Sequence, residues 1–434
     1  MTKGDKITDV KILGIESSCD ETAAAVVEDG FRLLSNVVAT QIKIHQLYGG
    51  VVPEVAARSH LEVVLPVIDK AVLESYLSCH PELVSGFNKK DLINSDWIPQ
   101  QVRNDIAEKA WFEIDAIACT TMPGLIGSLL IGSLTARTLA LIKNKPFYPI
   151  HHVEGHVYAN FLIEIPENIP GVIPREVAES SQKNIDSATN KLAQNDTPEF
   201  IKIRKTQPEF PMLALIVSGG HSQIVLFRDH GDYELIGQTA DDAVGEAFDK
   251  VAKILGLPYP GGPSIDKAAE NGDPHKYQFP KAHMQNPYDF SFSGLKTAVL
   301  RRVQAEVGKD HTFPSNGLSE LLTTQQRNDF AASFLNIAVE TLVDKVVKAY
   351  HEFQPKSVVI AGGVAADPEL RRQLKERLPI PIEYPPMKFC TDNAAMIASL
   401  GYFVSREKSP TDPRDVEVLP SISMTKTAWS VSRL

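Results

Sequence analysis

Cysteine is scarce in this sequence of 434 residues, and long apolar runs are missing. The four cysteines, Cys19, Cys79, Cys119 and Cys390, have no metal-knuckle spacing, so reduced thiols in a cytoplasmic protein are the simplest interpretation. No apolar run approaches the ~20 residues that cross a bilayer. The stretch from Met1 to Val10 also lacks the apolar core of a signal peptide. We therefore expect a cytoplasmic protein without membrane contact.

Concentrated positive charge is missing as well. The 44 Lys and Arg residues are outnumbered by 54 Asp and Glu residues, which gives a net charge of -10. The basic residues are dispersed, apart from short clusters such as Arg301-Arg302 and Arg371-Arg372. A protein that grips a nucleic acid alone usually has a basic face. If the substrate is an RNA, partner proteins must supply much of its binding.

What the sequence does contain is a rhythm that occurs twice. The segments 11–27 and 212–227 each place a polar turn, rich in Gly or Ser, between two apolar strands. Elsewhere strands alternate with helices, which is typical of α/β proteins. Because the chain is also too long for a single core, the repetition predicts a duplicated α/β fold of two lobes with a nucleotide cleft between them.

The expected boundaries follow from this pattern. We expect lobe I at residues 1–150, lobe II at 151–391, and a C-terminal helix that returns toward lobe I, with a tail, at 392–434. Two stretches, 77–110 and 164–209, carry turn-forming and polar residues without a sustained period. These stretches predict surface insertions.

The segment His151-His152-Val153-Glu154-Gly155-His156 contains two histidines four residues apart. On a helix, His152 and His156 would lie on one face at metal-binding distance. Spacing alone favours the plainer interpretation, a helix start with partly exposed histidines. A zinc peptidase needs Glu directly after the first histidine, where this chain has Val153. A metal would also need a carboxylate, which spacing does not locate.

Glycine turns form the second group of candidates. VSGGH at 217–221 follows a predicted strand, and glycines there let backbone amides approach a phosphate. For this stretch alone, a plain hairpin turn is the slightly stronger interpretation. Gly362-Gly363 ends another predicted strand, and Thr391-Asp392-Asn393 is a good helix N-cap. For each of these two, a structural role alone is the stronger interpretation.

An acidic segment, DDAVGEAFDK at 241–250, precedes the glycine-rich YPGGP at 259–263. Asp241 and Asp242 predict the capped start of a helix. Asp249 lies two turns further on, and aspartate is suited to accept hydrogen bonds from ribose hydroxyls. The two glycines would let the chain lie close to a nucleoside.

Taken in order, these segments resemble the TsaD family, the tRNA N6-adenosine threonylcarbamoyltransferases. The resemblance runs from residue 11 to about 400, outside the two predicted insertions, through GIESSCDET, YGGVVPEVAARSH, PGLIGSLLIG, HHVEGH, VSGGH, DDAVGEAFDK, YPGGP, FSFSGLKT, AGGVAAD and TDNAAM. It implies the two-lobed fold of actin, sugar kinases and Hsp70. The tail after Glu407 lacks the Arg-Pro-Arg-Trp ending common in the family, so no role is carried over there.

The resemblance also implies roles for particular residues. His152, His156 and Asp392 would bind one divalent metal ion, with iron as the first choice and zinc as the alternative. The nucleotide-linked substrate would be held by a larger set, which is Ile216, Val217, Ser218, Gly219, Gly220, Asp249, Gly262, Asp266 and Asp367. The family usually has Asn at position 367, and a carboxylate only accepts hydrogen bonds where an amide also donates. No catalytic acid or base is implied.

The implied activity is transfer of a threonylcarbamoyl group from threonylcarbamoyl-AMP to N6 of adenosine 37, in tRNAs that read codons beginning with adenine. TsaB-like and TsaE-like proteins are the implied partners, and the small-residue helix at 127–136 either receives a partner or packs inside its own lobe. Two other activities are disfavoured. An ATPase or sugar kinase would hold Mg²⁺ through carboxylates and phosphates, and a metallopeptidase, an activity once assigned to the family, would need HExxH. A non-catalytic scaffold is the third alternative.

Overall fold

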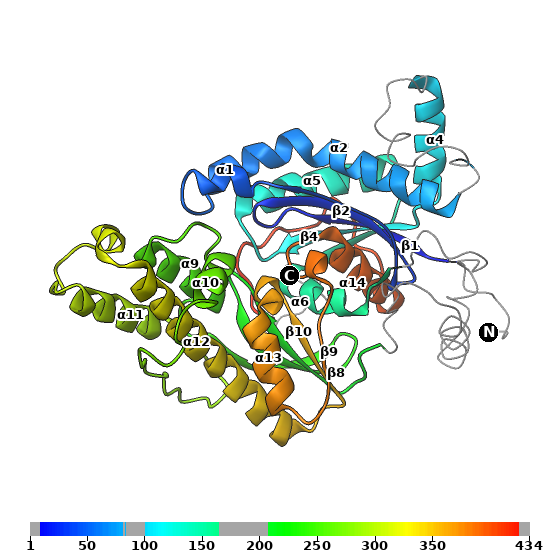
Figure 1. The fold of residues 1–434 in the computed structure, drawn as a ribbon. Helices are drawn as coiled ribbons and strands as arrows, with labels where there is room; N and C mark the ends of the chain where they lie inside the picture. The colour runs from blue at the N-terminus through cyan, green and yellow to red at the C-terminus, as the bar shows by residue number, and fades with distance from the viewer. Residues whose placement is uncertain (1–8, 81–82, 84–99, 165–206, 425–434) are drawn as a thin grey trace, which may run out of the picture.

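The computed structural model describes residues 9–80, 83, 100–164 and 207–424. Its strands form two mixed sheets, each belonging to one half of the chain (Figure 1). The first sheet has the order β5-β4-β1-β2-β3-β6 and the second has the order β11-β10-β7-β8-β9. The strands of the first sheet are β1 (Lys11–Glu16), β2 (Glu21–Glu28), β3 (Arg32–Thr40), β4 (Ala116–Met122), β5 (Phe147–His151) and β6 (Ile163–Glu164). Those of the second are β7 (Met212–Val217), β8 (Ser222–Asp229), β9 (Asp232–Gln238), β10 (Ser357–Ala361) and β11 (Ile382–Glu383).

The two sheets repeat one topology. In the first, β1, β2 and β3 form an antiparallel meander, and β4 and β5 add parallel strands beside β1. In the second, β7, β8 and β9 form the same meander, and β10 and β11 add parallel strands beside β7. The duplicated α/β fold predicted from the repeated rhythm is therefore confirmed.

The helices form layers around these sheets (Figure 1). α2 and α5 cover the outer face of the first sheet, α6 and α14 lie between the two sheets, and α9 to α13 cover the outer face of the second. The α-helices of the described ranges are α1 (Ile42–Gln46), α2 (Pro53–Cys79), α4 (Gln100–Phe112), α5 (Ile126–Ile142), α6 (His152–Tyr158), α9 (Val244–Leu255), α10 (Gly261–Ala269), α11 (Ser293–Glu306), α12 (Thr324–Phe353), α13 (Pro368–Arg377) and α14 (Ala394–Glu407). Short 3-10 helices follow as η2 (Ala159–Phe161), η3 (Ser315–Gly317), η4 (Ser319–Leu321), η5 (Gly363–Ala366) and η6 (Met387–Phe389).

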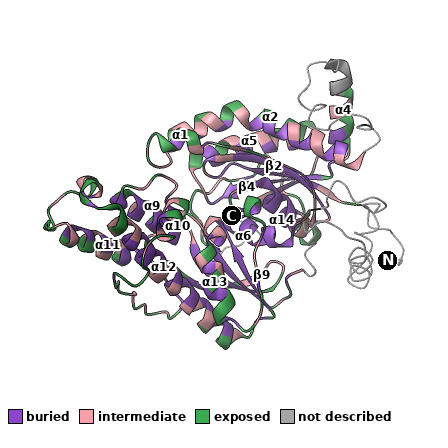
Figure 2. Ribbon diagram, viewed as in Figure 1, coloured by how far each residue is buried: buried purple, intermediate pink, exposed green. Residues whose placement is uncertain are grey.

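Both faces of each sheet are covered, which explains why the strands are nearly continuous apolar runs. In β1, Ile12 points into the core that contains α6 and α14, whereas Leu13 and Ile15 point into the core under α2 and α5. Figure 2 shows this burial along the strands of both sheets. Within the described residues, no helix is long and apolar enough to cross a bilayer.

α14 packs closely on the first sheet because glycines face it. A Cβ added to Gly14 would lie 2.3 Å from the Ala394 carbonyl oxygen, and one added to Gly401 would lie 2.4 Å from the Ala118 Cβ. Either contact is far inside van der Waals distance. The last helix of the chain is therefore fixed against strands formed by the first residues of the chain.

Residues 77–110 differ from the expected insertion at both ends. α2 continues to Cys79 with Leu77 buried, and α4 begins at Gln100 and packs Ala110 into the core under α2. The sequence analysis missed α4 because polar residues conceal its few apolar positions. Residues 81–82 and 84–99 lie outside the described residues, as do 165–206 of the second predicted insertion.

The expected cap formed by Asp241 and Asp242 is wrong, because α9 has no side-chain cap. Asp241 instead accepts hydrogen bonds from the backbone N–H groups of Phe292 (2.8 Å) and Ser293 (3.2 Å), where α11 begins. Asp242 forms an ion pair with Lys250 at 2.8 Å. The chain before α9 turns both carboxylates away from the end of their own helix.

The small residues of α5 pack inside their own lobe. A Cβ on Gly132 would lie 2.1 Å from the Ser17 Oγ, and one on Gly127 would lie 3.0 Å from the Ala57 Cβ. The side chains of α5 that reach the surface are larger and apolar, among them Leu134, which is 51% exposed. Any partner would therefore meet leucines rather than the small-residue stripe.

Candidate metal and nucleotide site

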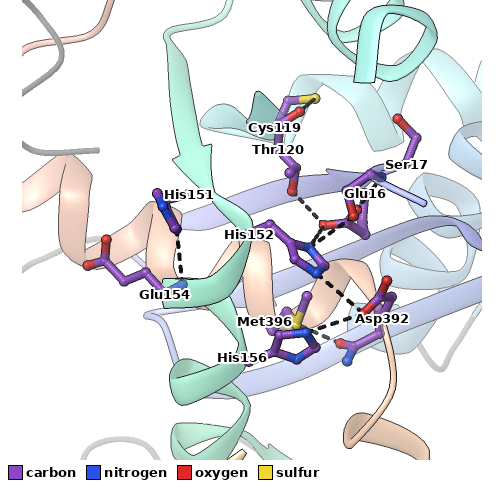
Figure 3. Close-up of polar contacts among 12 residues, drawn as sticks. Glu16, Ser17, Cys119, Thr120, His151, His152, Glu154, His156, Asp392 and Met396 are labelled. Carbon is purple, nitrogen blue, oxygen red and sulfur yellow. Dashed lines mark hydrogen bonds and ion pairs between the residues drawn. The ribbon is translucent and has the colours of Figure 1, made fainter. Parts of the chain in front are cut away.

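Two histidines and one aspartate meet where α6 begins (Figure 3). α6 begins directly after β5 and carries His152 and His156 one turn apart, with ring centroids separated by 4.7 Å. Asp392 comes from the loop before α14. Its Oδ1 atom lies 3.4 Å from Nε2 of His152 and 3.2 Å from Nε2 of His156. These three residues are named the HHD cluster below.

The HHD cluster fits a divalent metal ion. One ligand atom from each residue lies within 4.8 Å of the others. Two ligand atoms bound about 2.1 Å from one tetrahedral ion are separated by about 3.4 Å, close to the spacings of 3.2 and 3.4 Å found here. Two imidazoles and one carboxylate suit iron or zinc, and three protein ligands leave coordination positions open.

Glu16 holds His152 from the other side. This carboxylate is fully buried at the end of β1, and its Oε2 atom lies 3.0 Å from Nδ1 of His152. It also accepts hydrogen bonds from the Thr120 hydroxyl at 2.6 Å and from the Ser18 backbone N–H at 2.5 Å. Because Nδ1 faces a carboxylate, it keeps the ring proton, and the lone pair of Nε2 is directed into the HHD cluster.

The carboxylates around His152 control its protonation. Burial lowers the pKa of His152, but the charges of Glu16 and Asp392 outweigh burial and raise this pKa well above its usual value. Burial raises the pKa of Asp392, and the charge and hydrogen bonds of the two histidines outweigh it and hold that pKa low. A histidine must lose its proton before it binds a metal. Metal binding therefore competes with a proton on His152.

The remaining polar residues of HHVEGH have structural roles. His151 caps α6, since its Nδ1 atom accepts a hydrogen bond from the Glu154 backbone N–H at 3.3 Å. The Glu154 side chain accepts one from the Tyr233 hydroxyl at 3.2 Å. Figure 3 shows His151 and Glu154 pointing away from the HHD cluster. α6 therefore supplies two candidate ligands and no carboxylate base beside them.

The predicted nucleotide half of the site is built around the turn after β7. Ile216 and Val217 are fully buried, so only their backbones face the turn. Ser218 closes the turn, because its hydroxyl accepts a hydrogen bond from the His221 backbone N–H at 3.2 Å. Nothing lies within 4 Å of where a Cβ would stand on Gly219 or Gly220. The backbone is thus open to a ligand at both glycines.

Two other segments approach this turn through glycines. A Cβ on Gly362 would lie 2.4 Å from the Val217 carbonyl oxygen, and one on Gly245 would lie 2.6 Å from the Ser218 carbonyl oxygen. The chain after β10 and the start of α9 are therefore in direct contact with the turn. Gly262 on α10 is open, with nothing within 4 Å of its Cβ position.

The predicted substrate aspartates take part in local contacts. Asp249 on α9 accepts a hydrogen bond from the Gly261 backbone N–H at 2.7 Å. Asp367 is buried and caps α13, accepting from the Leu370 backbone N–H at 2.9 Å. The carboxyl group of Asp266 lies near that of Asp367, and the buried Oδ1 atom of Asp266 has no hydrogen-bond partner among the described residues.

Asp266 and Asp367 affect one another's ionisation. Burial and the neighbouring Asp367 raise the pKa of Asp266 to about 8, and burial raises the pKa of Asp367 as well. Two carboxylates this close, without a cation between them, cannot both ionise at low cost. This pair gives the nucleotide half an acidic group that can donate a hydrogen bond.

A hollow of about 580 Å³ lies away from both halves of this site, between α12 and α13. It is lined by His275, Asn336, Glu340, Arg372, Gln373, Glu376 and Arg377. Its two arginines are already paired, Arg372 with Glu369 and Glu376, and Arg377 with Asp344. The hollow has no unpaired cation for a ligand and is not part of the site.

The chain is similar to known proteins over most of its length. The model of the family described as TsaD, tRNA N6-adenosine threonylcarbamoyltransferase, matches residues 32–81, 105–175 and 197–399. The chain belongs to the TsaD family. Proteins named tRNA N6-adenosine threonylcarbamoyltransferase from Thermomicrobium roseum and Dehalococcoides mccartyi are each 42% identical to it, over 95% and 96% of this chain and 98% and 100% of their own. Among solved structures, HypF of T. kodakarensis covers 92% of this chain and 48% of its own, at 11% identity and a TM-score of 0.47.

The TsaD match covers every residue that the resemblance assigned to the metal and the substrate. The matched ranges leave out 82–104 and 176–196, which lie within the two predicted insertions. They also begin after Glu16, the residue of this site that the sequence analysis did not assign. The sequence did contain a signal for Glu16, since it is a carboxylate at the end of the apolar strand KILGIE. A charge buried in such a strand requires a partner.

Proposed function

We propose that this chain transfers the threonylcarbamoyl group of threonylcarbamoyl-AMP to N6 of adenosine 37 in tRNAs that read codons beginning with adenine. The observation that carries the proposal is the HHD cluster, formed by a chain of the TsaD family from residues far apart in sequence. His152, His156 and Asp392 would hold one divalent metal ion, iron or zinc. Because the substrates are a tRNA and an adenylate, we place the reaction in the cytoplasm.

The proposed reaction balances without a further reactant. A bond forms between N6 of adenosine and the carbamoyl carbon, and the bond from that carbon to a phosphate oxygen breaks. The electron pair leaves with AMP, and the amine loses one proton. The metal would supply Lewis acidity toward the adenylate oxygens. The residues of this chain would contribute mainly orientation and electrostatic stabilisation.

The glycine turn and the aspartates would bind the AMP portion. The open backbone at Gly219 and Gly220 suits a phosphate, since amide groups can approach it without a Cβ in the way. Asp249 and Gly262 would lie along the nucleoside, and the carboxyl pair of Asp266 and Asp367 would accept from and donate to its polar atoms. Asp249 and Asp367 each accept a backbone hydrogen bond and retain acceptor capacity.

Partner proteins form part of the proposal. The net charge of -10 leaves little surface that would neutralise tRNA phosphates, and a TsaB-like and a TsaE-like protein would assist binding and turnover. The outer helices of the first sheet offer a docking surface. Leu61 and Leu65 on α2 are 67% and 52% exposed, and Leu130 and Leu134 on the adjoining α5 are 39% and 51% exposed.

The test combines the full chain with tRNA, ATP, threonine, bicarbonate, the partner proteins and an adenylate-forming enzyme. Modified adenosine is then measured by mass spectrometry of the digested tRNA. We expect threonylcarbamoyl-adenosine, and with preformed adenylate we expect one AMP released for each adenosine modified. ATP hydrolysis or sugar phosphorylation with unmodified tRNA would favour the ATPase or kinase alternative, and peptide cleavage would favour a peptidase.

A further inference from the structure

Arg371 on α13 makes contacts in two directions. Its Nε atom donates a hydrogen bond to the Ala365 carbonyl oxygen at 2.7 Å. One terminal nitrogen lies 3.6 Å from Sγ of Cys390 and 3.8 Å from Sδ of Met387. The guanidinium also lies over the ring of Tyr384, 4.0 Å from its centroid. Arg371 therefore joins η5 to the segment around η6.

The first of these contacts leads to the nucleotide half of the site. Ala365 belongs to η5, the single turn that follows Gly362. Gly362 packs directly against the Val217 carbonyl oxygen, which would lie only 2.4 Å from a Cβ at this position. Its φ of 88° is in the left-handed region, where a residue with a side chain would be strained. Movement of η5 would thus displace the backbone of the glycine turn.

The second contact leads to the metal half. Cys390 is fully buried and stands two residues before Asp392. Asn393 holds the backbone on both sides of it. Its amide nitrogen donates a hydrogen bond to the Thr391 carbonyl oxygen at 2.8 Å, and its Oδ1 atom accepts one from the Met396 backbone N–H at 3.2 Å. Asp392 has little freedom once Cys390 and Asn393 are held.

We propose that Arg371 is a positioning residue that couples metal binding at the HHD cluster to nucleotide binding at the turn after β7. Its contacts connect the segment that supplies Asp392 to the segment that contacts Val217. Two ligands that each favour one arrangement of a shared element raise one another's affinity by the same factor. The inference rests on the proposed function, in which the HHD cluster and the turn are parts of one site.

The chemistry of the side chain explains why this position would need arginine. A guanidinium carries five N–H donors in a rigid plane, so one group can donate to a carbonyl on one side and reach sulfur on the other. It also stacks on an aromatic ring, as Arg371 does on Tyr384. Lysine would keep the charge but cannot hold both segments in one plane. Arg371→Lys therefore removes the connection while preserving the charge.

The experiment measures the coupling directly. The full chain is stripped with a chelator, and the dissociation constant of AMP is measured by calorimetry with and without Zn²⁺. For the unchanged protein we expect Zn²⁺ to tighten AMP binding about tenfold. For Arg371→Lys we expect a clearly smaller ratio, because only direct contact between the ion and AMP would then couple them, with zinc stoichiometry and melting temperature close to those of the unchanged protein. The matched control is Arg372→Lys, because Arg372 pairs with Glu369 and Glu376 on the same helix.

The possible outcomes separate the role of Arg371 from the proposed function. If AMP and Zn²⁺ bind without coupling, or if Arg371→Lys keeps the full ratio, Arg371 does not have this role, although the proposed function can stand. If the unchanged protein binds neither probe, the proposed function itself fails. If Arg371→Lys does not fold, Cys390→Ala is measured instead, since it removes one acceptor of Arg371 and keeps the arginine. The proposal requires that Cys390→Ala also lowers the ratio of the AMP dissociation constants without and with Zn²⁺.

Discussion

At the scale of single residues, each polar atom of His152 has a separate partner. Its Nδ1 atom faces Glu16 at 3.0 Å, and its Nε2 atom faces Asp392 at 3.4 Å. His156 is 1% exposed and has no partner for its Nδ1 atom among the described residues. The two histidines therefore differ in how firmly they are oriented, and substitutions around them should have different effects.

His156→Ala should abolish metal binding, because two of three protein ligands cannot hold the ion tightly. Transfer activity should fall with it, while the far-ultraviolet circular dichroism stays unchanged. Metal content is measured by elemental analysis of the purified proteins. His275→Ala is the control, since His275 is an exposed histidine on another surface. Undiminished metal stoichiometry in His156→Ala would refute the assignment of the HHD cluster.

Glu16→Gln should weaken metal binding by about 10- to 100-fold without abolishing it. The amide keeps a hydrogen-bond acceptor beside Nδ1 of His152 but removes the charge that makes the ring a stronger ligand. Zinc affinity is measured by competition with a chelating dye. The same change at Glu28, a buried carboxylate paired with Arg32, should leave zinc affinity unaltered. Equal affinities for both variants would contradict the orienting role of Glu16.

Asp367→Asn should remove a pH dependence of stability. The pKa of Asp266, raised to about 8 by burial and by Asp367, lies above its value in the unfolded chain, near 3.8. The folded protein then holds a proton that the unfolded chain releases, so the free energy of unfolding is highest below about pH 4 and falls as pH rises toward 8. One proton limits this slope to about 1.4 kcal/mol per pH unit.

Asparagine at position 367 would donate a hydrogen bond to Asp266 and would still cap α13. The proton on Asp266 is then unnecessary, so the fall in stability between pH 5 and 8 should become shallower than in the unchanged protein. Urea unfolding at several pH values measures the difference. Identical slopes for the two proteins would mean that the carboxyl pair does not share a proton.

At the scale of elements, the site depends on α6 and α14, which lie between the two sheets. One hydrophobic core contains Val153 and Val157 of α6, Met396 and Ile397 of α14, and residues of both sheets such as Ile216. α6 carries the two histidines, and the loop before α14 carries Asp392. The separation of the ligands is therefore set by how closely these helices pack against the strands.

Gly14→Ala should move α14 and disturb the HHD cluster. Its new Cβ would lie 2.3 Å from the Ala394 carbonyl oxygen, and relief of such overpacking costs about 1–3 kcal/mol. We expect a lower melting temperature and weaker zinc binding, measured by thermal unfolding and dye competition. Gly294→Ala is the control, because nothing lies within 4 Å of its Cβ position in α11. Full zinc affinity in Gly14→Ala would show that the ligands tolerate a shifted α14.

At the scale of the whole molecule, charge and exposed apolar surface both favour dependence on partners. The net charge is -10, and the small residues of α5 are already used inside the lobe. The exposed leucines of α2 and α5 remain at the surface. Under the proposed function, we expect weak binding of tRNA by this chain alone and stronger binding in a complex, since linked binding surfaces add avidity.

The chain alone should therefore modify tRNA poorly, even with preformed adenylate. Adding the TsaB-like and TsaE-like partners should raise turnover about tenfold or more. Leu130→Asp combined with Leu134→Asp should remove most of this gain without altering AMP binding, because both leucines are at the surface of α5. Equal, sustained multiple turnover with and without the partners would refute the dependence.

The sequence by itself determined the features that depend on local spacing. Apolar strands around polar turns predicted the first two strands of each meander, and the four-residue interval between His152 and His156 placed both rings on one helix face. Strand and helix periods express themselves within a few residues, so these features could be predicted. The resemblance added Asp392 to the histidines, which spacing could not do.

Only the tertiary structure decided which distant groups meet. Glu16 stands behind His152 because β1 and α6 are packed together, and Asp241 caps α11 rather than its own helix. The raised pKa of Asp266 depends on burial and on its nearness to Asp367, the N-cap of α13. Such contacts are set by side-chain packing between elements far apart in sequence, and no local period encodes them.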